Sequence, residues 1–101
     1  TGASGEYVEL NDQEIIPTRT LIWSAGVTPN PVLALLPAPK SQQGGVVVDG
    51  FLKLPEFPEV YVIGDGASVL DRRQGRPYPA LAPVAIRQGI RAAGNIRNTL
   101  Q

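Results

Sequence analysis

The residue of this sequence best suited to ligand chemistry is an aspartate that lies between two glycines at the end of an apolar run. Residues 60–63 lead directly into Gly64-Asp65-Gly66. A run of this kind is typical of a parallel strand covered on both faces, and ligands of open α/β sheets bind beyond the carboxyl ends of such strands. We therefore expect Asp65 to accept hydrogen bonds from sugar or ribityl hydroxyls. The alternative is a turn aspartate that bonds its own backbone.

Two other short stretches carry groups that suit a ligand. Pro83 predicts the first turn of a helix, and the free N–H groups of residues 84–86 would favour an anionic ligand oxygen. The small residues Ser24-Ala25-Gly26 follow an apolar segment and would let a backbone or a cofactor come close. Each has a plainer interpretation, because every helix has such an end and Gly26 also suits a simple turn.

Several other kinds of chemistry are excluded by what the chain lacks. It has no Cys and no His, so a disulfide, a thiolate nucleophile and an imidazole base are absent. No carboxylate pair, nucleophile with a base or metal cluster occurs, and neither a complete G-x-G-x-x-G nor a Walker Gly-Lys-Ser/Thr is present. Met is also missing, including at position 1, and we expect the chain to be a processed or excised piece.

Length and composition predict one small globular domain. The 101 residues are 43% hydrophobic and 18% charged, a balance typical of a folded chain. No apolar run approaches the roughly 20 residues that span a bilayer, and no signal region opens the chain. We therefore expect no transmembrane segment and a cytoplasmic location. No nucleic-acid-binding motif is present and aromatic residues are sparse, so no nucleic acid partner is expected.

Charge is distributed unevenly along the chain. Up to Asp65, eight acidic residues stand against three basic ones, and beyond it six arginines stand against Asp71 alone. One interpretation is that the two halves complement each other electrostatically within one fold. The other is that the basic C-terminal third, residues 72–97, meets phosphate or an acidic partner.

The N-terminal half predicts strands and a connection. Residues 7–10 and 14–16 flank the turn-forming Asn11-Asp12 and predict a β-hairpin. Residues 20–23 predict another apolar strand. The Pro-rich segment that follows has room for one short helical turn at residues 32–36 and is expected to be a connection.

The C-terminal half predicts a small β-meander and then a helix. Residues 46–48, 51–53 and 60–63 are strand-like, and residues 71–76 suit a solvated loop tip. Residues 81–100 predict the helix. Its expected apolar stripe comprises Ile86, Ile90, Ala93 and Leu100, and its glycines, Gly89 and Gly94, predict close packing against a sheet.

Four motifs occur in the order found in one family of flavoproteins. Trp23-Ser24-Ala25-Gly26 matches a W-x-A-G crossing and is followed by Pro29-Asn30-Pro31. The apolar strand into Gly64-Asp65 matches a second flavin motif, and residues 79–89 match a P-x-x-A-x-x-A-x-x-Q-G helix. The ordered set covers residues 6–97. It resembles the C-terminal part of the pyridine nucleotide–disulfide oxidoreductase superfamily, and most closely type II NADH dehydrogenases.

The resemblance implies an α/β fold, as a fragment of a flavoprotein with two dinucleotide-binding, Rossmann-like domains. The fragment would comprise a β-hairpin, a small β-meander and a C-terminal helix. Residues 1–23 would be the tail of the NAD(P)H-binding domain, residues 24–45 the crossover linker, and residues 46–101 the C-terminal part of the FAD-binding domain. The family's first FAD fingerprint lies upstream of these residues, so the chain would hold only part of the FAD site.

The resemblance also implies roles for single residues. Asp65 would hold the ribityl chain of FAD, with Gly64 giving backbone clearance. The start of the last helix would bring an N–H near the flavin pyrimidine carbonyl and stabilise negative charge on the reduced ring. No catalytic or metal-binding residue is expected. The residues expected to contact the cofactor are Gly64, Asp65, Gly66, Ala67, Ala82, Pro83, Val84, Ala25 and Gly26.

The implied activity is that of an FAD-dependent NAD(P)H dehydrogenase. A hydride would pass from NAD(P)H to flavin, and electrons would pass on to a quinone or another acceptor. Type II NADH dehydrogenases carry glutamines where this chain has Pro83 and Arg87, and only Gln88 is retained, which weighs against a quinone acceptor. The intact protein would be peripheral to the membrane, and the 101-residue fragment alone would be inactive.

The expected partner is the upstream remainder of the same polypeptide. A parallel sheet cut from its partner strands exposes apolar faces and unpaired edges. We therefore expect the fragment to form a homodimer by exchanging strands or the last helix. The alternatives to the enzyme are a non-enzymatic binding module, which would use the basic third, and a purely structural domain.

Overall fold

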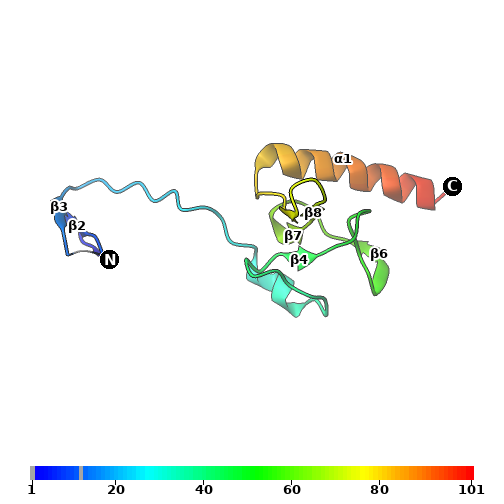
Figure 1. The fold of residues 1–101 in the computed structure, drawn as a ribbon, viewed down its shortest axis with the longest axis horizontal. Helices are drawn as coiled ribbons and strands as arrows, with labels where there is room; N and C mark the ends of the chain where they lie inside the picture. Colours follow the sequence, from blue (N-terminus) through cyan, green and yellow to red (C-terminus); the bar gives the residue numbers. More distant parts are fainter. Residues whose placement is uncertain (1, 12) are drawn as a thin grey trace.

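The computed structural model describes residues 2–11 and 13–101. Thr1 and Asp12 lie outside the described residues, and with them one residue of the predicted Asn11-Asp12 turn. The chain is elongated, with extents of 62 × 26 × 26 Å. A small N-terminal sheet stands apart from a larger C-terminal unit, and an extended segment joins the two (Figure 1).

The N-terminal sheet has three short antiparallel strands. They are β1 (Gly2–Ala3), β2 (Tyr7–Glu9) and β3 (Ile15–Pro17), in the order β1-β2-β3. In the hairpin, Tyr7 pairs with Pro17 and Val8 with Ile16. The predicted hairpin is therefore confirmed, because its alternation and polar turn are local signals that need no distant partner.

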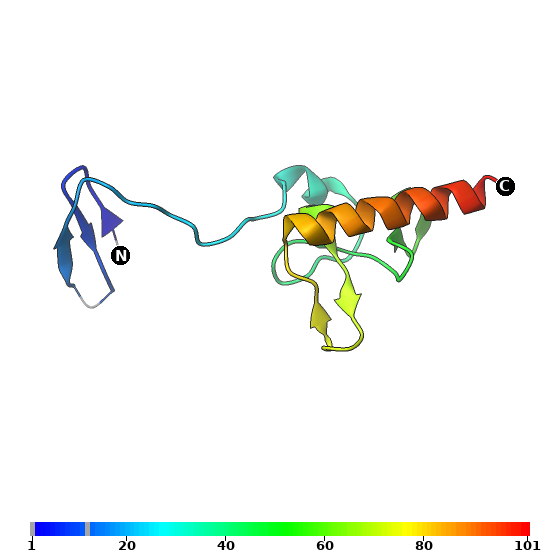
Figure 2. The ribbon, with the colours of Figure 1, turned by 90° about the horizontal axis from the view of Figure 1, so that it is seen from above.

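The strand predicted at residues 20–23 is wrong. The chain there is extended, but it forms no strand and runs unpaired between the two units (Figures 1 and 2). Ile22 and Trp23 are 84% and 76% exposed. A strand requires a neighbour for its N–H and C=O groups, and no described segment pairs with this one.

The predicted helical turn at residues 32–36 is confirmed as the 3-10 helix η1 (Pro31–Leu35). Asn30 caps it, because its Oδ1 accepts the N–H of Val32 at 2.9 Å, and Pro31 suits the first position. Leu33 and Leu36 pack against the core. The connection therefore also contributes to the C-terminal unit.

The C-terminal unit contains three two-stranded sheets. The strands are β4 (Val46–Val47), parallel to β7 (Ala67–Ser68); β5 (Lys53–Leu54), antiparallel to β6 (Phe57–Tyr61); and β8 (Leu70–Asp71), antiparallel to β9 (Arg76–Pro77). The 3-10 helix η2 (Gly64–Gly66) follows β6. With one long helix beside these sheets, the protein is a small α/β structure.

Residues 60–63 do not form the predicted parallel strand. Only residues 60 and 61 belong to a strand, β6, and its partner β5 is antiparallel. Val62 is buried and donates its N–H to the Leu52 carbonyl, but Ile63 is exposed. The expectation of a strand covered on both faces is therefore wrong for this chain, because β6 has one strand neighbour and a turn follows it.

Residues 46 and 47 of the predicted strand 46–48 form β4 and residue 48 lies outside it, whereas most of 51–53 forms a turn before β5. Asp49 holds this turn, since its Oδ1 accepts the N–H groups of Phe51 and Lys53, both at 2.9 Å. The predicted loop tip at 71–76 closes the β8–β9 hairpin, which was not predicted. The buried apolar core is small and comprises Val46, Val48, Leu52, Leu54, Val62 and Ala92.

The predicted C-terminal helix is confirmed as α1 (Ala82–Thr99), which lies across the C-terminal unit (Figure 1). The predicted orientation of its apolar stripe is wrong. Ile86 and Ile90 are 63% and 72% exposed, whereas Gln88 and Ala92 are buried. The face of α1 that meets η2 and Ile63 carries Ala85, Gln88 and Gly89 in place of the isoleucines.

The two helical glycines differ. At Gly89 an added Cβ would lie 3.8 Å from Ile63 Cδ1, as expected for packing against the unit. At Gly94 nothing among the described residues comes within 4 Å of an added Cβ. The prediction of close packing is therefore wrong for Gly94.

Candidate functional site

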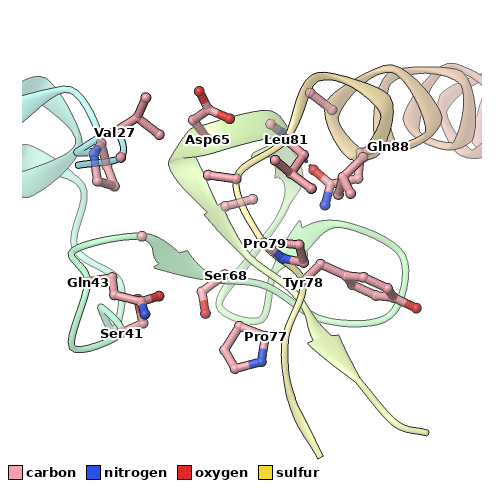
Figure 3. Close-up of a pocket in the computed structure, with 18 of the residues that line it drawn as sticks. Val27, Ser41, Gln43, Asp65, Ser68, Pro77, Tyr78, Pro79, Leu81 and Gln88 are labelled. Atoms are coloured by element: carbon pink, nitrogen blue, oxygen red, sulfur yellow. Dashed lines mark hydrogen bonds between the residues drawn. The ribbon is translucent and has the colours of Figure 1, made fainter. Parts of the chain in front are cut away.

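A cavity of about 650 Å³ opens where four parts of the chain meet (Figure 3). They are the crossing segment (residues 25–29), η2, β7 and the start of α1. Its other walls are the turn at residues 41–45 and the stretch at residues 76–81 that leads into α1. The predicted cofactor residues that line it are Ala25, Gly26, Gly64, Asp65, Ala67 and Val84. Segments that are far apart in the sequence are thus brought together at one place.

Asp65 projects from η2 at the edge of this cavity, away from Ser68 and Pro77 (Figure 3). The residue is exposed, and no described residue donates a hydrogen bond to its carboxylate. The alternative interpretation, in which a turn aspartate bonds its own backbone, therefore does not hold in this structure. The carboxylate is available to donors from outside the chain.

Gly64 joins η2 to α1. Its N–H donates to Gln88 Oε1 at 2.7 Å, and the Gln88 side chain is buried. Its φ of +67° lies in the left-handed region that favours glycine. An added Cβ would lie 3.5 Å from Ala85 Cβ, an ordinary contact. Backbone conformation, and not clearance from the helix, therefore requires glycine at this position.

Gly66 has a different environment from the one predicted. It does not line the cavity, and an added Cβ would lie 2.7 Å from Leu33 Cδ1. That distance is too short for two carbon atoms without a shift of the Leu33 side chain. Gly66 therefore lets η2 pack against Leu33 of η1.

The first turn of α1 differs from the expectation of several free N–H groups. The N–H groups of Val84 and Ala85 both donate to the Leu81 carbonyl, at 2.9 and 3.0 Å. Since Pro83 has no N–H, Ala82 is the first-turn residue whose N–H no described carbonyl accepts. Ala82 and Pro83 do not line the cavity, whereas Val84 does.

Several residues of the cavity wall were not predicted. Ser41, Gln43, Ser68 and Tyr78 line it, and Gln88 both lines it and holds Gly64 (Figure 3). For Gln88 the sequence carried a signal, because a polar residue stands among the small residues of the helix. No local signal marked Ser41 or Gln43, which reach the cavity through the fold of their turn.

The family model of pyridine nucleotide-disulphide oxidoreductases matches residues 1–89. The chain belongs to this family. The family resemblance stated from the motifs is therefore confirmed.

Curated relatives extend the comparison. An internal alternative NAD(P)H-ubiquinone oxidoreductase A1, mitochondrial, of Solanum tuberosum is 40% identical over 84 residues, which is 83% of this chain and 17% of the relative. A type II NADH:quinone oxidoreductase of Staphylococcus saprophyticus is 29% identical over 98 residues, 96% of this chain and 24% of the relative. This chain therefore spans between about a sixth and a quarter of the length of these relatives.

Neither a metal site nor a membrane-spanning helix is found among residues 2–11 and 13–101. No group of three or more His, Cys, Asp or Glu side chains there could hold a metal ion. No described helix combines the length and the apolar character needed to cross a membrane.

Proposed function

We propose that this chain is the C-terminal part of an FAD-dependent NAD(P)H dehydrogenase. In the whole protein a hydride would pass from NAD(P)H to the flavin, and electrons would pass on to a quinone or another acceptor. The observation that carries the proposal is the Asp65 carboxylate, free of partners at the edge of a cavity of about 650 Å³. Family membership and the names of the relatives support it.

The residues around the cavity fit a flavin nucleotide. Asp65 can accept hydrogen bonds from ribityl hydroxyls, and a charged acceptor makes such bonds strong. Ala25, Gly26 and Ala67 line the wall with little side-chain bulk, which leaves room for a ligand. The N–H of Ala82, which lies at the start of α1 but outside the cavity lining, has no described acceptor and would be open to a ligand oxygen. FAD, when bound, would accept the hydride, and the chain's residues would position it.

We propose the domain division that the motifs predicted. Residues 1–23 would be the tail of the NAD(P)H-binding domain, 24–45 the crossover linker, and 46–101 the C-terminal part of the FAD-binding domain. The separation of the N-terminal sheet from the C-terminal unit supports this division (Figure 1). The crossover linker would carry Ala25 and Gly26 to the cavity, where they meet residues of the FAD-binding part.

The location of the intact protein is part of the proposal. A quinone acceptor would require contact with a membrane, and we propose a cytoplasmic protein that is peripheral to it. Pro83 and Arg87 stand where the type II enzymes carry glutamines, so the acceptor is proposed only as a class. The 101-residue chain alone would lack much of the FAD site and would be inactive.

The proposed partner is the upstream remainder of the same polypeptide. The exposed stripe of α1, with Ile86, Ile90 and Leu100, has no cover among the described residues. Such a surface favours association. In the 101-residue chain alone, we expect a second copy to cover it, by simple dimerisation or by exchange of strands or α1.

Sedimentation velocity at micromolar concentration tests this association. A dimer mass is the expected result for the 101-residue chain. Ile86→Glu together with Ile90→Glu should shift the chain to a monomer, because the two added charges oppose burial of the stripe. A wild-type chain that sediments as a monomer would contradict the dimer.

The experiment that tests the flavin proposal compares Asp65→Ala with wild type in the complete polypeptide that carries this chain. Loss of a charged acceptor should weaken FAD binding by about tenfold or more. Glu59→Ala is the matched control, since Glu59 is exposed and outside the cavity. FAD content after gel filtration is the measurement, and equal FAD content in the three proteins would contradict the role of Asp65.

One observation favours the alternative of a binding module. None of the six arginines after Asp65 forms an ion pair with a described carboxylate, so the two halves are not joined by such pairs. The basic third is therefore free to meet an acidic partner. Asp65→Ala would leave binding of such a partner unchanged, which separates this function from the flavoprotein.

A further inference from the structure

A second cavity, of about 700 Å³, adjoins the first. It lies between the turn at residues 50–52, the β8–β9 hairpin and α1. Tyr78, Val84 and Gln88 line both cavities and form the wall between them. In Figure 2 the hairpin extends to one side of α1.

Four arginines line this second cavity. Arg72 and Arg73 come from the turn of the β8–β9 hairpin, and Arg87 and Arg91 lie one turn apart on α1. Their guanidinium groups form no hydrogen bond or ion pair with any described residue. Four positively charged side chains from two separate elements therefore line one cavity, and no described carboxylate forms an ion pair with any of them.

Asp71 is the one acidic residue in the lining of the second cavity, and its hydrogen bonds hold the turn of the β8–β9 hairpin. Asp71 is buried, and its Oδ1 accepts the N–H of Arg73 at 2.9 Å, while its carbonyl accepts the N–H of Gly75 at 2.8 Å. These bonds hold the turn that carries Arg72 and Arg73. The carboxylate makes no ion pair with any of the four guanidinium groups. Four positive charges therefore stand against one negative charge in the lining.

Like charges repel, so this arrangement is most stable with an anion between them. The planar guanidinium fork matches phosphate oxygens in a bidentate manner. Phe51 and Leu70, each 58% exposed, and Tyr78 stand beside the arginines. They offer apolar and aromatic surface to the rest of a ligand.

We propose that the second cavity binds the phosphate or diphosphate group of an amphiphilic or aromatic ligand. The arginines bind the phosphate oxygens, and Phe51 and Tyr78 contact the apolar part. The site differs from the proposed flavin site, because Asp65, Ala25 and Gly26 do not line it, although the two cavities share the wall formed by Tyr78, Val84 and Gln88. The same phosphate chemistry can come from a soluble ligand or from a lipid headgroup.

Isothermal titration of the 101-residue chain with pyrophosphate tests the site. We expect saturable binding, weakened about tenfold or more by Arg87→Gln or Arg91→Gln, because each change removes a charge-assisted contact. Arg97→Gln is the matched control, with the same charge change on the same helix but outside the cavity. Far-UV circular dichroism verifies that α1 is retained in each variant.

Two results would overturn the proposal. One is the absence of saturable pyrophosphate binding to the folded wild-type chain. The other is an equal weakening by Arg97→Gln and Arg87→Gln, because that would mean a diffuse effect of net charge. Asp65→Ala should leave pyrophosphate binding unchanged, so failure of this site and failure of the flavin proposal give different results.

Co-sedimentation with vesicles distinguishes the two sources of phosphate. Phosphatidylcholine vesicles with and without phosphatidic acid are compared, with pyrophosphate as competitor. Binding to the acidic vesicles that pyrophosphate displaces supports the site with a lipid headgroup as its ligand. Pyrophosphate binding without vesicle binding supports the site with a soluble ligand. Vesicle binding that Arg87→Gln does not weaken would contradict the proposal.

Discussion

The turns that hold Asp65 and Asp71 differ in what their carboxylates do. Asp71 is buried and accepts the N–H of Arg73, and Asp49 similarly accepts two backbone N–H groups in its own turn. Asp65 lies in η2, is exposed and has no partner among the described residues. Two of these aspartates are used to build turns, and the third remains available to a ligand.

The two cavities also differ in the charged groups that line them. The first is lined by the free carboxylate of Asp65, by Arg76 and by neutral side chains, several of them small, a combination that suits a hydroxyl-rich ligand (Figure 3). The second is lined by four unpaired arginines beside exposed apolar surface, which suits a phosphate. Tyr78, Val84 and Gln88 lie between the two cavities, and only the second has an excess of positive charge in its lining.

The largest stability effect should come from Asp71. Asp71→Ala removes the acceptor of the Arg73 N–H and should lower the free energy of unfolding by about 1–3 kcal/mol. Asp71→Asn keeps an oxygen acceptor and should cost less. Urea unfolding followed by circular dichroism measures both.

Asp65→Ala is the comparison for Asp71→Ala in the same unfolding experiment. It should change the free energy of unfolding by no more than about 0.5 kcal/mol, as for an ordinary surface substitution. A loss as large as that of Asp71→Ala would mean that Asp65 also supports the fold. The distinction between the two aspartates would then fail.

A smaller effect should separate Gly64, which lines the first cavity, from Gly94 of α1, which lines neither cavity. Gly64→Ala places a Cβ on a residue with φ +67° and should destabilise the chain by about 1–2 kcal/mol. Gly94→Ala has open space around it and should stabilise α1 by up to about 1 kcal/mol. Thermal unfolding shows whether each substitution raises or lowers the stability of the chain. A stabilising Gly64→Ala would contradict the claim that the positive φ of Gly64 requires glycine.

The elements that the sequence predicted correctly depend on local signals. The hairpin of β2 and β3 has alternation around a polar turn, and α1 has a proline in its first turn and a continuous helical pattern. η1 has a capping asparagine followed by proline. Each of these signals acts within a few residues, so no knowledge of the tertiary structure was needed.

The incorrect predictions depend on contacts between distant segments. Residues 20–23 have the composition of a strand, but no described neighbour pairs with them. The apolar stripe of α1 faces outward, because close approach to η2 requires small residues and Gln88 at the contact. The β8–β9 hairpin pairs only two residues on each side, too few for a recognisable pattern.

The candidate site was predictable in part. Asp65, Ala25, Gly26 and Val84 were named from the sequence, and all four line one cavity. The sequence selected Asp65 but left open whether its carboxylate would bond its own backbone, because whether a carboxylate is free depends on the conformation of its turn. The second cavity was not predicted, since it arises from the packing of the hairpin against α1.

The most direct test of the account is the visible spectrum of the native polypeptide, isolated from its source and weighed by mass spectrometry. We expect a flavin band and a mass well above the 10.7 kDa of this chain. A colourless polypeptide of about 10.7 kDa would contradict the proposal that the chain completes the FAD site of a larger dehydrogenase.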